Sequence, residues 1–146
     1  MWRTYLPYYH PTGCSGLEGG APAEQYHGHL GELFSYMDVT GVSTQYRKLY
    51  FRNEYNFTLD DCRVYFSVLE HSGQLAVATA SGYSTGHVES APGDAGTFVT
   101  PTGISGGLEV GSVAPGEYVG VWLRLHVTTG EDPFAYANIA IGGYRS

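Results

Sequence analysis

Hydrophobic and polar residues alternate along several short stretches of the chain, and the clearest of these stretches covers residues 118–127. A period of two places successive side chains on opposite faces, as in a β-strand with one face buried. The inward set predicted for this strand is Val119, Val121, Leu123, Leu125 and Val127. The outward set is Tyr118, Gly120, Trp122, Arg124 and His126.

Two other stretches have the same period. Residues 46–52 place Leu49 and Phe51 on one face and, on the other, Tyr46, Lys48, Tyr50 and Arg52. Residues 62–68 alternate Cys62, Val64, Phe66 and Val68 with Arg63, Tyr65 and Ser67. Weaker patterns predict strands at 75–80, 97–100, 107–112 and 135–141. Short strands separated by Gly/Pro turns are typical of a sandwich or barrel, so we predict an all-β fold, an Ig-like antiparallel β-sandwich over residues 32–146.

Two turns of the form Ala-Pro-Gly-acid punctuate this domain, at residues 91–94 and 114–117. Proline presets the first central angle of a type II turn, and glycine adopts the positive φ of the second. We therefore expect positive φ at Gly93 and Gly116. Residues 81–96 are otherwise rich in Gly, Ser and Thr, which predicts a long solvated loop and a candidate contact tip.

Residues 1–31 differ from the rest because they are rich in Gly, Pro, Tyr and His without a helical or strand period. This pattern predicts an irregular N-terminal arm with no secretory signal. Aromatic side chains with a polar end favour partner contact, so we expect the arm to mediate contact and oligomerisation. The candidate contact residues are Trp2, Tyr5, Tyr8, Tyr9 and His10. The outward aromatic residues of the strands either contact a partner or fill the second face of the sandwich beneath the arm.

The length of 146 residues fits one compact domain. The formal net charge of −7 disfavours nucleic acid as a partner, because such a chain repels phosphate. The apolar runs are far shorter than the ~20 residues of a membrane helix, so we expect no membrane span. The two cysteines, Cys14 and Cys62, allow one disulfide, but nothing in the sequence requires it.

Motifs that carry enzymatic chemistry are weak in this chain. Gly-x-Ser-x-Gly occurs around Ser84 and Ser105, but a hydrolase nucleophile needs a helix after the serine, and no helical pattern follows either one. A Walker loop is excluded because the single lysine, Lys48, follows an arginine and not a glycine. We therefore predict a protein that is not an enzyme and has no cofactor.

Two groups of residues could approach a metal ion. His27 and His29, with His10 or Cys14, lack the spacing of a zinc site and are better explained as polar surface. The acid pairs at 60–61 and 131–132 lie in predicted turns, where carboxylates usually cap or solvate the backbone. We predict no metal site.

Residues 31–53, 59–66 and 108–124 together carry a resemblance to a known family. They resemble small Ig-like β-sandwich structural proteins of tailed bacteriophages. The shared elements are the Leu33-Phe34 lead-in, the Tyr46-Arg47 opening of a strand that ends at Asn53, and the turn at 114–117 that leads into Val121-Trp122-Leu123-Arg124.

This resemblance implies a virion component without catalytic activity, namely a capsid decoration (cement) protein. Such a protein lies on the capsid exterior and binds the major capsid protein. By analogy with the three-fold junctions of icosahedral shells, we also expect it to form a homotrimer. Two alternatives remain open: a phage tail or fibre component, and a carbohydrate-binding β-sandwich module in which Trp122 or the arm tyrosines stack on sugar rings.

Overall fold

The described part of the chain in the computed structural model is mostly β-strand. The structure describes residues 44–69, 74–80, 93–127 and 137–145 in full, and the backbone alone of residues 8–11, 22–26 and 43. One single-turn 3-10 helix, η1 (Ile104–Gly106), interrupts the strands of these segments. The strands are β1 (Tyr8–Pro11), β2 (Pro22–Tyr26), β3 (Ser43–Arg52), β4 (Leu59–Leu69), β5 (Leu75–Thr79), β6 (Leu108–Val113), β7 (Tyr118–Val127) and β8 (Ala137–Arg145).

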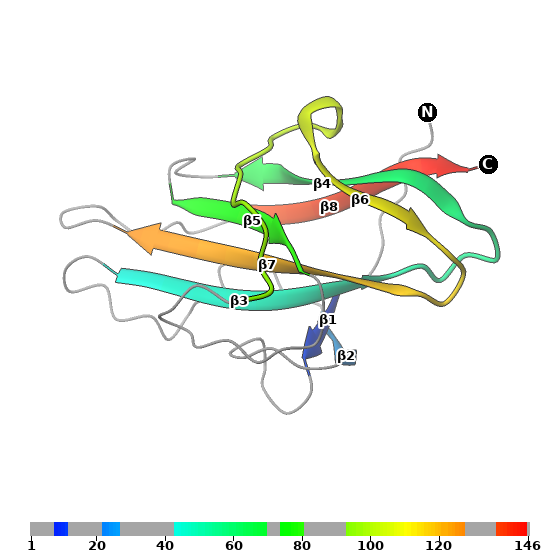
Figure 1. The fold of residues 1–146 in the computed structure, drawn as a ribbon, viewed down its shortest axis with the longest axis horizontal. Helices are drawn as coiled ribbons and strands as arrows, with labels where there is room; N and C mark the ends of the chain where they lie inside the picture. The colour runs from blue at the N-terminus through cyan, green and yellow to red at the C-terminus, as the bar shows by residue number, and fades with distance from the viewer. Residues whose placement is uncertain are drawn as a thin grey trace.

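The strands form two antiparallel sheets that pack face to face (Figure 1). One sheet has the order β2-β1-β3-β7-β5, and the other has the order β6-β4-β8. The loop after β3 and the turn after β6 each carry the chain from one sheet to the other at the same end of the molecule. The predicted all-β sandwich is confirmed. No helix in the described segments has the length and apolar character needed to cross a membrane.

Most of the core between the sheets consists of apolar positions that the period-two pattern selected. Val68 is an exception: the β4–β8 register shifts between Phe66 and Val68, and Val68 is 44% exposed. On β3 and β7, Leu49, Phe51, Val121 and Leu123 are completely buried. The facing sheet contributes Val64 and its neighbours from β4, with the inward side of β8. The full set of buried core residues is Leu49, Phe51, Leu59, Cys62, Val64, Phe66, Leu75, Val77, Val113, Val121, Leu123, Leu125, Val127, Ala137, Ile139 and Ile141.

The outer face of the β3-β7-β5 sheet is also covered at its aromatic positions, for which the sequence left partner contact and a filled second face as alternatives. Trp122 and Lys48 have no exposed area, and Tyr50 is 2% exposed. The ring of Tyr50 lies over Gly120, where a Cβ atom would come within 2.9 Å of Tyr50 Cε1. The alternative that the strand aromatics fill a second packed face is therefore correct for these side chains.

Residues 93–101 join the two sheets along one side. Val77 and Val99 exchange two backbone hydrogen bonds of 2.8 and 2.9 Å, so this segment extends the β5 edge. Two residues later, Pro101 O accepts a hydrogen bond of 2.8 Å from the amide of Phe66 on β4. Because the same segment bonds to both sheets, it ties them together before the chain enters η1.

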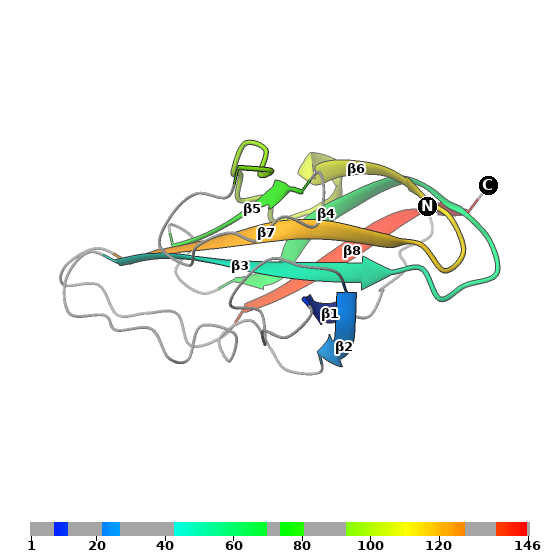
Figure 2. The ribbon, with the colours of Figure 1, turned by 60° about the horizontal axis from the view of Figure 1, so that its bottom comes forward.

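Two expectations need correction. Inside the arm predicted to be irregular, β1 and β2 pair with each other, and β1 pairs with the end of β3 through Tyr8↔Phe51 and Tyr9↔Tyr50 (Figure 2). These strands are too short to show alternation, and proline occurs in each. The second correction concerns Gly93: Gly116 has φ 77° as predicted, but Gly93 does not adopt a positive φ.

Candidate binding surface

The end of the sandwich at which β3 leads into β4 is held rigid by a single buried side chain. Asn53 is completely buried, and its Nδ2 donates hydrogen bonds to Phe57 O at 2.9 Å and to Val113 O at 2.8 Å. Its Oδ1 accepts from the amide of Tyr55 at 3.0 Å. Its own backbone bonds to Gly116 and Glu117 of the neighbouring turn. Asn53 thus links two loops, so side chains presented here start from a fixed backbone.

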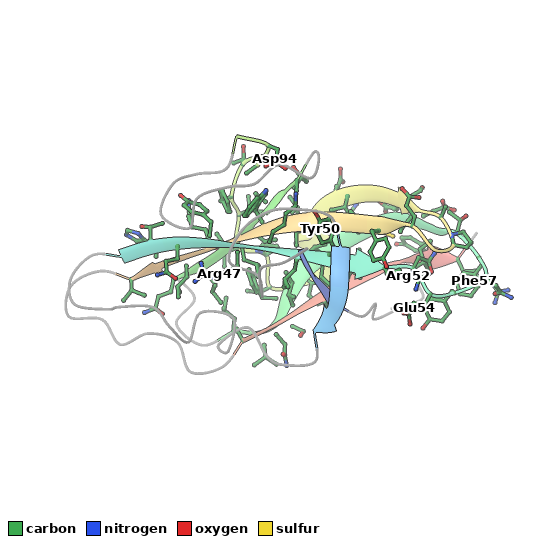
Figure 3. All side chains as sticks on the ribbon, turned by 90° about the horizontal axis from the view of Figure 1, so that it is seen from below. Arg47, Tyr50, Arg52, Glu54, Phe57 and Asp94 are labelled. Carbon is green, nitrogen blue, oxygen red and sulfur yellow. The ribbon has the colours of Figure 1, made fainter. Side chains whose placement is uncertain are left out.

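Aromatic and arginine side chains gather at this end. The ring centroids of Tyr55 and Phe57 are 4.9 Å apart, and the guanidinium of Arg145 lies 4.3 Å from the Phe57 ring. Tyr55 is 43% exposed and Tyr144 is 38% exposed, which makes them two of the few large exposed apolar residues of the described segments. We call Tyr55, Phe57, Tyr144 and Arg145 the end surface. Figure 3 shows Phe57 beside Arg52 and Glu54 at one end of the sandwich, with Arg47 toward the other.

A second arginine stacks on an aromatic ring nearby. The Arg52 guanidinium lies 5.5 Å from the Tyr118 ring and pairs with Glu54 at 3.9 Å. Both charged side chains are about half exposed, at 40% and 47%, so the pair contributes little to stability. Arg52 on β3 and Tyr118 on β7 thus add a second aromatic and cationic contact at this end.

A recess of about 200 Å³ lies next to the end surface, on the outer face of the β6-β4-β8 sheet; it is lined by Asp61, Arg63, Ile104, Ser105 and Tyr144. A β-bulge in β4 creates one of its walls: Asp61 has φ 49°, and the register shifts on both sides of it. Such a backbone directs the Asp61 carboxylate outward.

Arg63 crosses this recess and is held from several sides. Its Nη1 donates to Ser105 O at 3.1 Å, and its Nη2 lies 3.3 Å from Glu109 and 3.6 Å from Asp61. Ser105 therefore offers its carbonyl to an arginine, and no imidazole lines the recess. The only imidazole described, that of His126, bonds instead to Thr44 at 2.6 Å. The Ser105 motif thus gains no support as a nucleophile.

The most deeply buried polar cluster lies on the outer face of the other sheet. Lys48 Nζ pairs with Asp94 Oδ2 at 3.3 Å and lies 5.3 Å from the ring centroids of both Tyr50 and Trp122. Trp122 Nε1 donates to Asp94 Oδ1 at 3.1 Å. Asp94 is thus seated on the sheet with a 10% exposed side chain, which corrects the expectation that this part of the 81–96 loop is solvated.

Three groups that lie outside the end surface have pKa values shifted by burial. It lowers the pKa of Lys48, although Asp94 opposes this effect, and it lowers the pKa of Arg47. Burial, with the charge of Asp60 as a smaller cause, raises the pKa of the Cys62 thiol to about 11. Cys62 is a free, buried thiol whose Sγ contacts Leu59 O at 3.4 Å, so its environment is that of a core residue and not of a nucleophile.

Many of the candidate contact, metal-binding and nucleophile residues lie outside the described segments. This applies to Trp2, Tyr5, Cys14, His27, His29, Ser84 and the acid pair at 131–132; of Tyr8, Tyr9 and His10 only the backbone is described. Within the described segments, no three His, Cys, Asp or Glu side chains group as metal ligands. Asp60 instead accepts a 2.9 Å hydrogen bond from Ser112, in keeping with a structural role.

The end surface itself was missed in the sequence. Tyr55 and Phe57 belong to a loop without period, and Tyr144 and Arg145 extend beyond the strand predicted at 135–141. The available signal was compositional: two aromatic residues in a six-residue connection between strong strands are unusual, because such connections favour small polar residues.

Comparisons with protein-family models, curated proteins and solved structures gave no match.

Proposed function

We propose that this protein is a non-enzymatic structural component of a tailed-phage virion, a capsid decoration protein that binds the major capsid protein on the capsid exterior as a homotrimer. The observation that carries this proposal is the end surface. Exposed aromatic and arginine side chains on a backbone fixed by Asn53 are the chemistry with which proteins bind other proteins.

The construction of the sandwich supports an adhesive role. The inner core is apolar, and the outer face of the β3-β7-β5 sheet is covered by a second packed layer around Trp122. A body packed on both sides of one sheet changes little in shape when it binds, so its contact side chains are presented with little loss of conformational entropy. The net charge of −7 keeps such a protein away from packaged nucleic acid.

The carbohydrate-binding alternative named Trp122 as the strand residue that stacks on sugar, and the structure does not support this role. Trp122 has no exposed area and donates its indole N–H to Asp94, so its ring cannot stack on a sugar. A sugar site would have to use other rings, and the exposed ring of Tyr55 shares its surroundings with Arg145 and Phe57 in an arrangement equally suited to protein contact. No observation favours sugar over protein.

Co-assembly tests the proposal directly. The full chain is expressed with the major capsid protein encoded by the same phage genome, and particles are separated by sedimentation and imaged by electron microscopy. We expect the chain to sediment with the particles at constant stoichiometry, with density on the outer surface at three-fold positions. A chain that stays at the top of the gradient while binding polysaccharide in a calorimeter would refute the proposal and support the carbohydrate-binding module.

The arm gives a second test of the same proposal. A variant lacking residues 1–30 keeps β3 to β8, which contain the whole described core. We expect it to fold but not to decorate particles, and to sediment as a monomer where the full chain sediments as a trimer. Wild-type occupancy by the truncated chain would contradict the role assigned to the arm.

A further inference from the structure

We propose that the end surface is the docking site for the partner protein and that its anchor is Arg145, which receives a carboxylate side chain of that partner. This inference rests on the proposed function, because it specifies the chemistry with which the capsid subunit is recognised. It places a contact on the sandwich itself, separate from the N-terminal arm.

Arg145 is arranged to bind a carboxylate. Its guanidinium carbon lies 4.3 Å from the Phe57 ring centroid, and both Tyr144 and Arg145 are exposed. A guanidinium held against a ring keeps its edge available for hydrogen bonds, and its planar fork matches the two oxygens of a carboxylate. The stacked side chain also has fewer conformations to lose on binding, which strengthens the contact.

The backbone beneath the stack is fixed from both sides. Arg145 is paired with Leu59 at the start of β4, so the end of β8 and the loop that carries Phe57 are held together. The loop is closed by the hydrogen bond from Asn53 Nδ2 to Phe57 O. Tyr55, 43% exposed and 4.9 Å from Phe57, provides an apolar rim that excludes water from an ion pair at Arg145.

The local charge favours an acidic partner. The chain carries a formal charge of −7, but the acids of the described segments that meet at this end contact partners within the protein. Asp60 accepts a hydrogen bond from Ser112, and Asp61 lies 3.6 Å from Arg63. Glu54 pairs with Arg52, and Glu117 Oε2 accepts a 2.9 Å hydrogen bond from the amide of Ala114. Arg145 is therefore a cationic point on an acidic body. A nucleic acid would be repelled by that body, whereas one carboxylate on a protein surface is complementary to this point.

The adjacent recess does not offer an equivalent anchor. Arg63 already contacts Asp61, Glu109 and the carbonyl of Ser105, so a partner carboxylate would have to displace groups that the protein supplies. Arg124 stacks on Phe98 at 4.9 Å but is only half-exposed on the opposite sheet. This second stack serves as a matched control for the chemistry of the first.

The test measures binding to particles assembled from the major capsid protein alone, at several concentrations of sodium chloride. We compare the wild-type chain with Arg145→Gln, Arg145→Lys and Tyr55→Ser. The controls are Arg124→Lys, which alters the other stack, and Val68→Ser, which removes a 44% exposed apolar side chain near the far end of β4. Thermal melts of every variant establish that each one folds.

We expect Arg145→Gln to weaken binding about thirtyfold or more, which corresponds to ~2 kcal/mol for losing one partner of a desolvated charge pair. Arg145→Lys keeps the charge without the fork and should lose about tenfold. Tyr55→Ser should also weaken binding, and both controls should stay within about twofold of wild type. The salt dependence of binding should be smaller for Arg145→Gln than for the wild-type chain, because one screened charge is gone.

The outcomes separate the two proposals. If the wild-type chain binds and folded Arg145→Gln binds equally well, the docking site is wrong while the decoration function stands. If Arg145→Lys binds like wild type while Arg145→Gln does not, the anchor is a simple charge and the bidentate contact is refuted. If the wild-type chain does not bind the particles at all, the proposed function fails, and the docking site fails with it.

Discussion

Removing the carboxylate of Asp94 is the sharpest test of how the outer face of the β3-β7-β5 sheet is held together. In the folded protein, Lys48 is completely buried and pairs with Asp94 at 3.3 Å, and Trp122 donates to the same carboxylate. The variant Asp94→Ala removes this carboxylate from the buried ammonium group of Lys48 and from the indole N–H of Trp122. We expect a large loss of folding stability.

The size of the stability loss depends on whether Lys48 stays charged or loses its proton in the folded variant. Breaking a buried ion pair by removing one partner costs about 3–5 kcal/mol. Lys48 can escape part of this cost by losing its proton, but at pH 7 that step costs about 4.8 kcal/mol from the ordinary pKa of 10.5. Both routes give about 3–5 kcal/mol, which is a third or more of the ~5–15 kcal/mol that stabilises a typical domain.

Chemical and thermal unfolding measure this loss. At roughly 2–4 °C per kcal/mol, the melting temperature of Asp94→Ala should fall by about 6–20 °C. The tryptophan emission of the folded variant should shift to longer wavelength as water reaches Trp122, with Trp2→Phe as the background. In a double-mutant cycle, Lys48→Met with Asp94→Ala should recover most of the stability, because no charge is then left buried.

The pH dependence gives an independent check. Burial lowers the pKa of Lys48 in the fold, so the unfolded chain binds this proton more tightly, and stability rises with pH from the folded pKa toward 10.5. Without Asp94 the pKa falls further, and the difference in stability between wild type and Asp94→Ala should narrow between pH 7 and pH 10. A loss below 1 kcal/mol, no coupling in the cycle, or a constant difference across this pH range would refute the reasoning.

Three further predictions test the packing. Gly120→Ala should destabilise the fold by about 1–3 kcal/mol in denaturant titrations, because its Cβ would lie 2.9 Å from the Tyr50 ring, whereas Gly103→Ala, with nothing within 4 Å, should not. In a Cys14→Ser background, Cys62 should resist a thiol reagent at pH 8 until the protein unfolds, because the pKa of its thiol is raised to about 11. The folding stability should also fall as the pH rises from 9 toward 11, because the thiol of the unfolded chain ionises first in this range. Leu123→Asp should abolish the cooperative melt, since it places a carboxylate at a position with no exposure; a native-like melt would show that the inward face is assigned wrongly.

The strands were predictable because their hydrophobic period is a local property. Leu49 and Phe51, like Val121 and Leu123, alternate with polar or aromatic neighbours, and one buried face is enough to select a strand. The strands β1 and β2 were not predictable in the same way. They have four and five residues, and they exist as partners of the β3 edge.

The end surface was beyond sequence reasoning for a different reason. Tyr55 and Phe57 come from the loop after β3, while Tyr144 and Arg145 end the last strand, about ninety residues later in the chain. Only the pairing of β4 with β8, through Leu59↔Arg145, brings these segments together. Similarly, Lys48 and Asp94 are 46 positions apart, and no local pattern links a strand lysine to a turn aspartate.

The sequence by itself determined most of the inner core on β3, β4 and β7, since a period of two separates the faces of a strand wherever one face is buried. It also predicted the positive φ of Gly116, although the same Pro-Gly pair does not give a positive φ at Gly93. Tertiary structure decided that the second face is buried. Trp122 and Lys48 carry polar or charged groups that the sequence pattern places outside, yet both are buried and share Asp94 as a partner. Satisfaction of a buried polar group depends on a partner from elsewhere in the chain, and only the folded arrangement supplies one.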